Sequence, residues 1–124
     1  RRSKISNPEE LMRVLPKASE GVSARLVQLA YMPFEEQLRL MRNTNVLIGT
    51  HGAGLTFAPF LADDAVVIEL NHWVQRNHAS KFHFQNLAAW SGKGYIRWKN
   101  ENVENEIDAY FIKVDPKTFQ KLVQ

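Results

Sequence analysis

The feature that most constrains this chain is a pair of short apolar runs on either side of a glycine-rich turn. Val46-Leu47-Ile48 and Ala65-Val66-Val67-Ile68 are apolar at every position. Runs without alternation are typical of parallel strands that are buried on both faces. Because parallel strands are joined by a crossover, the sequence predicts a strand, a short helix and a second strand, and Pro59 should kink or end that helix.

Helix and strand patterns also alternate along the rest of the chain. Asn7-Pro8-Glu9-Glu10 has the order of a helix start, and Pro16 and Gly21 should stop the helix. Further predicted elements are a strand over 25–30, a helix from Pro33 to about Arg42, a helix over 77–90, strands over 95–98 and 110–114, and a last helix from Asp115. This alternation predicts an α/β fold: a Rossmann-like, open, mostly parallel sheet with helices on both faces.

Composition narrows the functional classes. The 124 residues predict a single domain over 1–124, and the start at Arg1 without Met leads us to expect a fragment of a longer, two-domain protein. The absence of Cys excludes disulfides, a thiolate nucleophile and a zinc site built on sulfur. The net charge of +3 suits small anionic ligands but does not indicate a nucleic-acid groove. No apolar run approaches the roughly 18 residues of a membrane helix.

The turn Gly49-Thr50-His51-Gly52-Ala53-Gly54 follows the first apolar strand, where open α/β sheets place their ligands. Glycines let a ligand approach the backbone, and the free N–H groups of a following helix attract anions, so a phosphate group is the expected ligand. The order G-x-x-G-x-G matches neither the dinucleotide fingerprint nor a Walker loop. Glycines that serve only tight packing of strand and helix are the alternative.

Side chains near this turn suggest further contacts, each with a simpler alternative. The imidazole of His51 can donate to a phosphate oxygen or merely be satisfied within the fold. Glu69 ends the next strand and can accept hydrogen bonds from a ribose diol or pair with a neighbouring cation. Trp73 can stack on a base. The basic residues at the start of the chain, Arg2 among them, can contact an anion or remain solvated.

Neither metal binding nor serine hydrolysis is indicated. His72, His78 and His83 lack partners at the spacing of the H-E-x-x-H zinc motif, so we predict no metal site. The serines lie in no G-x-S-x-G elbow, which leaves a serine hydrolase without a nucleophile.

The stretch from Asn45 to Thr56, NVLIGTHGAGLT, followed by AVVIEL over 65–70, resembles the signature of glycosyltransferase family 61. Other pieces agree in order: Asn7 to Leu11 resembles the arginine-led entry I-x-N-x-x-E-L, FEEQL over 34–38 resembles the F-x-E-Q-L helix, and YIRW over 95–98 resembles a late Tyr-x-x-Trp strand. The resemblance therefore extends over most of the chain. Pro59 and the segment 71–83 depart from the pattern, and this leaves the donor sugar open.

This resemblance implies an inverting transferase with a two-domain GT-B fold, of which the chain is the carboxyl-terminal, donor-binding half. His51, Gly52, Ala53 and Gly54 would line the diphosphate of a UDP-sugar, with Glu69 at the ribose and Arg2 at the phosphates. The donor is expected to be UDP-GlcNAc or UDP-xylose, and the acceptor a hydroxyl of a glycoprotein or polysaccharide. No cofactor or obligatory metal is implied, and a eukaryotic member would act in the lumen of the endoplasmic reticulum or Golgi.

Two points stay open at the level of sequence. The catalytic base is not identifiable, because it is expected in the missing amino-terminal half or in the cleft between the halves. The alternative function is a non-catalytic Rossmann-like domain that serves as a protein-docking surface through Trp73 and the aromatic helix from Phe82 to Trp90, because fold alone does not determine function.

Overall fold

The computed structural model describes residues 4–18, 24–50, 52–71, 82–99 and 111–112. By its contacts the chain divides into two compact units, residues 28–99 and residues 1–27 with 100–124. Arg2, His51, Trp73 and the helix predicted from Asp115 lie outside the described residues. The expectation of a single nucleotide-sugar-binding domain stays a prediction.

In the unit that contains both ends of the chain, strand β1 (Lys4–Ile5) pairs in parallel with β5 (Phe111–Ile112). The helix α1 (Pro8–Ala18) begins directly after Asn7, as predicted, and the Leu11 amide donates to the Asn7 carbonyl at 3.4 Å. Pro16 does not stop the helix, which ends at Ala18, and Gly21 lies outside the described residues. A proline removes one amide donor, here the partner of the Met12 carbonyl, and this loss does not stop the helix before Ala18.

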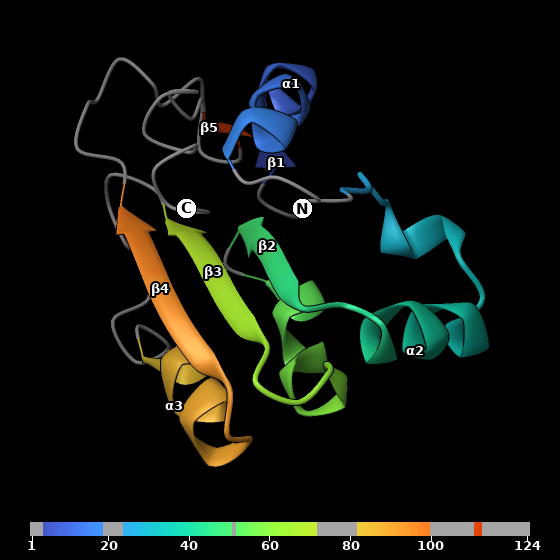
Figure 1. Ribbon diagram of the computed structural model, residues 1–124, viewed down its shortest axis with the longest axis vertical. Helices are drawn as coiled ribbons and strands as arrows, with labels where there is room; N and C mark the ends of the chain where they lie inside the picture. The colour runs from blue at the N-terminus through green and yellow to red at the C-terminus, as the bar shows by residue number, and fades with distance from the viewer. Residues whose placement is uncertain (1–3, 19–23, 51, 72–81, 100–110, 113–124) are drawn as a thin grey trace. The chain divides into compact units, whose positions relative to one another are not determined.

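The second unit is built on a parallel sheet of three strands in the order β2 (Val46–Thr50), β3 (Val66–Asn71) and β4 (Gly94–Lys99), as Figure 1 shows. All three strands were predicted. β3 is almost entirely buried, as its composition indicates, whereas β2 is half-buried and Val46 at its start is exposed. The sheet with its helices confirms the α/β class, while the Rossmann-like and GT-B details stay predictions.

Two helical connections join the strands. The 3-10 helix η2 (Ala53–Phe60) links β2 to β3, and the helix α3 (His83–Trp90) precedes β4. Pro59 neither kinks nor ends an α-helix here, because the whole segment is a 3-10 helix that continues to Phe60. Right-handed crossovers between successive neighbouring strands put both connections on one face of the sheet. η2 and α3 both pack on the face of Val67, and helices on both faces stay a prediction.

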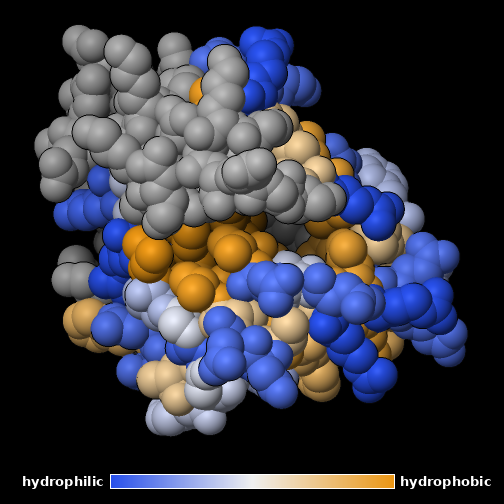
Figure 2. Space-filling view, viewed as in Figure 1, coloured by the Kyte–Doolittle hydropathy of each residue, from blue (hydrophilic) through white to orange (hydrophobic). Residues whose placement is uncertain are grey.

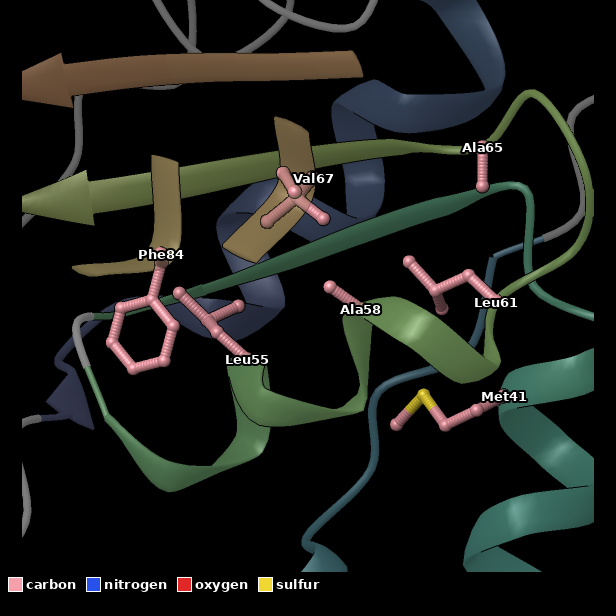
Figure 3. Packing of buried hydrophobic residues seen from close by; sticks show 8 residues of the cluster. Met41, Leu55, Ala58, Leu61, Ala65, Val67 and Phe84 are labelled. Carbon is pink, nitrogen blue, oxygen red and sulfur yellow. The ribbon is translucent and has the colours of Figure 1, made fainter. Parts of the chain in front are cut away.

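The core of this unit lies between that face and the helices (Figure 3). Leu55 and Ala58 of η2 and Leu61 directly after it point toward Ala65 and Val67, while Phe84 comes from α3. Met41 comes from the predicted helix α2 (Phe34–Arg42) and completes the cluster, as Figure 3 shows. Figure 2 shows an apolar surface over the sheet, in the same view as Figure 1. Val46 and Ile96, which lie on the face of the sheet opposite to that of Val67, are exposed.

The strand predicted over 25–30 is wrong. Residues 24–28 have no regular structure, and the short 3-10 helix η1 (Leu29–Tyr31) follows them. A strand needs a neighbour for its amides and carbonyls. The Leu29 carbonyl instead accepts from the Gln37 side chain of α2 at 2.7 Å and from the Met32 amide at 3.0 Å, and these local bonds favour a turn over a strand.

Candidate functional site

The glycine turn lies where the sequence predicts it, between the carboxyl end of β2 and the start of η2. Its described glycines differ in role. A side chain at Gly49 would place its Cβ 3.3 Å from Leu55 Cδ2, so this glycine allows the buried leucine of η2 to pack on the strand. A side chain at Gly54 would be in ordinary contact with Leu29, at 3.5 Å. Packing therefore accounts for Gly49.

Gly52 is different. Among the described residues, the nearest atom to a Cβ built at Gly52 is the Thr50 carbonyl oxygen at 3.8 Å, an ordinary contact, so no described neighbour excludes a side chain where η2 begins. Its φ of 170° is extended backbone, which requires no glycine. Neither packing against the described residues nor backbone conformation therefore requires a glycine here, and the approach of a ligand to its backbone stays a prediction. The backbones of Ala53 and Gly54 form the first turn of η2 directly behind it.

The strands β3 and β4 carry a second group of polar residues, which we call the Glu69 cluster: Glu69 and Asn71 near the carboxyl end of β3, and Tyr95 and Arg97 on β4. The parallel register places Glu69 opposite Gly49 on one side and opposite Arg97 on the other. Since alternate residues of a strand share a face, the whole cluster lies on the same face as Gly49 and Val67.

Hydrogen bonds join the cluster into one network. The Tyr95 hydroxyl donates to Glu69 Oε1, and Arg97 Nε donates to the Tyr95 hydroxyl oxygen at 3.1 Å. In the amide orientation that satisfies its neighbours, Asn71 donates to Glu69 Oε2 at 3.1 Å and accepts from Arg97 Nε at 3.2 Å. Each oxygen of the Glu69 carboxylate thus accepts from a protein donor.

This network explains how a carboxylate can lie in the interior. Glu69 is 0% exposed, and a buried carboxylate is tolerated only where donors surround it. Burial, together with the hydrogen bond to Glu69, raises the pKa of Tyr95 to about 12, so the phenol remains a donor at every physiological pH. A ribose at Glu69 would have to replace or share these donors. The ribose role of Glu69 stays a prediction.

Sequence reasoning missed Asn71 and Tyr95 as partners of Glu69, and Arg97 as the donor to both of them. The signal was present as polar residues two positions apart on each strand, Glu69 with Asn71 and Tyr95 with Arg97, because residues i and i+2 share a face. The pairing of the two strands is what brings these polar positions together.

The helix proposed for docking has both buried and exposed members. Phe84 and Ala88 of α3 belong to the core, whereas Phe82 is 52% exposed and Trp90 is 82% exposed. Within the described ranges, no group of three or more His, Asp or Glu side chains could hold a metal ion. None of the helices in those ranges is long and apolar enough to cross a membrane.

Comparison with known proteins adds an independent finding. A profile of the family described as glycosyltransferase 61 matches residues 1–68. The EGF domain-specific O-linked N-acetylglucosamine transferase of Gallus gallus is 39% identical over 101 residues, which cover 80% of this chain and 18% of that protein. The corresponding transferases of Drosophila melanogaster and Mus musculus are 34% and 39% identical over 80% and 77% of this chain. The chain spans 18% of the length of these relatives.

Proposed function

The chain belongs to glycosyltransferase family 61, and from this premise we propose that the intact protein transfers a sugar from a UDP-sugar to a hydroxyl of a glycoprotein. The donor is UDP-GlcNAc and the acceptor hydroxyl lies on an EGF domain, by analogy with the names of the similar transferases. UDP-xylose is the alternative donor. As in the family resemblance, configuration at the sugar inverts and UDP leaves.

Within that protein, the described chain contributes the donor-binding part. The observation that carries this proposal is the backbone at Gly52, which no described side chain approaches closely, at the end of the parallel strand β2 in a chain of this family. The diphosphate approaches Gly52, Ala53 and Gly54, where the amides of the first turn of η2 favour an anion. His51 and Arg2 contact the phosphates.

The rest of the donor and the chemistry follow from the same proposal. A ribose would contact Glu69 only by replacing or sharing the donors of Tyr95 and Asn71, and Trp73 stacks on the base. Cationic side chains and helix amides offset the charge that develops on the leaving UDP, so no metal ion is required. The base that takes the acceptor proton lies outside this chain or in the cleft it forms with the remainder of the protein. The protein acts in the lumen of the endoplasmic reticulum or Golgi.

The proposal is tested on the intact protein. UDP is titrated by calorimetry, and transfer from UDP-GlcNAc or UDP-xylose to a folded EGF domain is followed by mass spectrometry, with and without a chelator. We expect UDP to bind and N-acetylglucosamine to be transferred in the presence of chelator. Binding without turnover of either donor would favour the docking function instead, and absence of UDP binding would overturn the proposal.

A further inference from the structure

The Glu69 cluster restricts the orientation of Arg97, a residue to which the sequence analysis assigned no role. A carboxylate with 0% exposure is costly to bury, and hydrophobic residues of similar size would stabilise the sheet at least as well. What the cluster provides in addition is orientation, because Tyr95 and Asn71 both accept from the same atom, Arg97 Nε, at 3.1 and 3.2 Å.

Ring contacts restrict Arg97 further. Its Cζ lies 5.4 Å from the centroid of the Phe82 ring and 5.8 Å from the centroid of the Tyr95 ring. Arginine is the cation suited to such contacts, because its planar guanidinium stacks on aromatic rings while its N–H groups remain arranged for paired bonds to oxygen anions. Arg97 is therefore a charged group whose direction is set before any ligand arrives.

Arg97 lies in the same row of the sheet as Gly49, the first residue of the glycine turn. Gly49, Glu69 and Arg97 occupy one row across β2, β3 and β4, on one face and at the carboxyl ends of the strands. Two strand spacings, about 10 Å in all, separate the first and last backbones of this row. The same edge carries the start of η2 after Gly52, the start of α3 after Phe82, and the exposed Lys99 at the end of β4.

Charge at this edge favours an anion. Among the described residues of the carboxyl ends of β3 and β4, Arg97 and Lys99 are cationic and Glu69 is the acidic member. The Glu69 carboxylate accepts from Tyr95 and Asn71 inside the protein, whereas Arg97 is only partly buried. The starts of two helical elements add positive partial charge.

We infer that Arg97 binds the diphosphate of the nucleotide donor from the side opposite the glycine turn, and that Glu69, Asn71 and Tyr95 are its positioning residues. This inference rests on the proposed function, since it names a further contact of the same donor site. It gives Glu69 a role through Arg97 that differs from direct contact with the ribose.

The experiment compares two ligands, UDP and uridine, on the intact protein. Uridine keeps the base and ribose but lacks both phosphates, so a phosphate contact affects UDP alone. The variants are Arg97→Met, Arg97→Lys and Glu69→Gln, with Arg42→Met as the matched control because Arg42 is an exposed cation at the end of α2, before β2 begins. Calorimetry measures UDP, an NMR titration measures uridine, and thermal denaturation verifies that each variant folds.

We expect Arg97→Met to weaken UDP binding by about tenfold or more, in the range of one lost charge-assisted contact, and to flatten the salt dependence of UDP binding. Arg97→Lys should restore only part of the affinity, because lysine lacks the planar fork. Glu69→Gln should weaken UDP several-fold and leave uridine unchanged, as should Arg97→Met, while Arg42→Met should alter neither ligand.

The possible failures are distinguishable. If the wild-type protein does not bind UDP, the proposed function fails and this inference with it. If the wild type binds UDP and Arg97→Met binds it equally well, Arg97 is not a diphosphate contact, although the proposed function stands. Equal losses of UDP and uridine in Arg97→Met would mean a structural role only, and a loss of uridine in Glu69→Gln would favour the ribose contact over the positioning role.

Discussion

A pair of glycine substitutions separates ligand approach from packing in the turn after β2. Gly49→Ala would place a methyl group 3.3 Å from Cδ2 of Leu55, which is buried and surrounded by the core. Overpacking of a core typically costs roughly 1–3 kcal/mol, and a Gly→Ala change returns about 0.4–1 kcal/mol by restricting the unfolded chain. We therefore expect Gly49→Ala to lower the free energy of unfolding by about 0.5–2 kcal/mol.

Gly52→Ala should act in the opposite direction on stability. The nearest atom to its new methyl group is 3.8 Å away, and a φ of 170° suits alanine as well as glycine. Only the restriction of the unfolded chain remains, so the free energy of unfolding should rise by about 0.4–1 kcal/mol. The methyl group would nevertheless stand where the diphosphate approaches. Loss of one charge-assisted hydrogen bond, about 1.5–3 kcal/mol, corresponds to UDP binding weaker by about 10- to 100-fold.

The assay is denaturant unfolding together with UDP calorimetry on wild type and both variants of the intact protein. In Gly52→Ala the free energy of unfolding should rise while the affinity for UDP falls. UDP affinity equal to wild type in that variant would refute the approach of a ligand at Gly52. A loss of stability as large as in Gly49→Ala would refute the inference that a methyl group fits at Gly52 without a close contact.

Three other predictions concern single side chains. His51→Ala should weaken UDP binding, because the imidazole next to Gly52 is proposed to donate to a phosphate oxygen, and an unchanged dissociation constant in calorimetry would reject that role. The tyrosinate absorbance at 295 nm should show one phenol, absent in Tyr95→Phe, that ionises near pH 12. Because this pKa lies above the ordinary 10.0, the contribution of the Tyr95 hydrogen bond to the free energy of unfolding is complete below pH 10 and is lost as the pH rises through 12. Ionisation of this phenol at the ordinary value would contradict its buried hydrogen bond to Glu69. Leu55→Ala should lower the free energy of unfolding by about 2–5 kcal/mol in denaturant, because Leu55 is 2% exposed in the centre of the core, and a change below about 1 kcal/mol would show that the site collapses around the gap.

The elements with strong local signals could be predicted from the sequence. Apolar runs gave β2 and β3, and helical spacing after Pro33 gave α2 within its observed bounds. The strand predicted over 25–30 failed because strand-forming residues do not provide a strand partner, and Gln37, eight residues after Leu29, satisfies that backbone instead. A side-chain bond of this kind leaves no trace in the strand propensity of residues 25–30.

The site was predictable in place but not in its contacts. The position of the glycine turn and of Glu69 at the strand ends follows from chain order alone. Which glycine serves packing and which lies open depends on Leu55, whose direction only the fold determines. The partners of Glu69 likewise depend on pairing with a strand that begins 25 residues further along the chain, at Gly94.

That pairing links the stability of the sheet to the proposed chemistry. A slip of one residue between β3 and β4 would move every side chain of β4 to the other face, so that Ile96 would replace Arg97 beside the turn and the Glu69 carboxylate would lose Tyr95. The register is held at its start by Gly94, where an added Cβ would lie 3.1 Å from Val66 Cγ2, and by the core around Val67 and Tyr95. Hydrophobic packing at the amino ends of the strands thus determines where the cation lies at their carboxyl ends. A core substitution that loosens this register should therefore weaken UDP binding in proportion to the loss of pairing, even though the substituted residue touches no ligand.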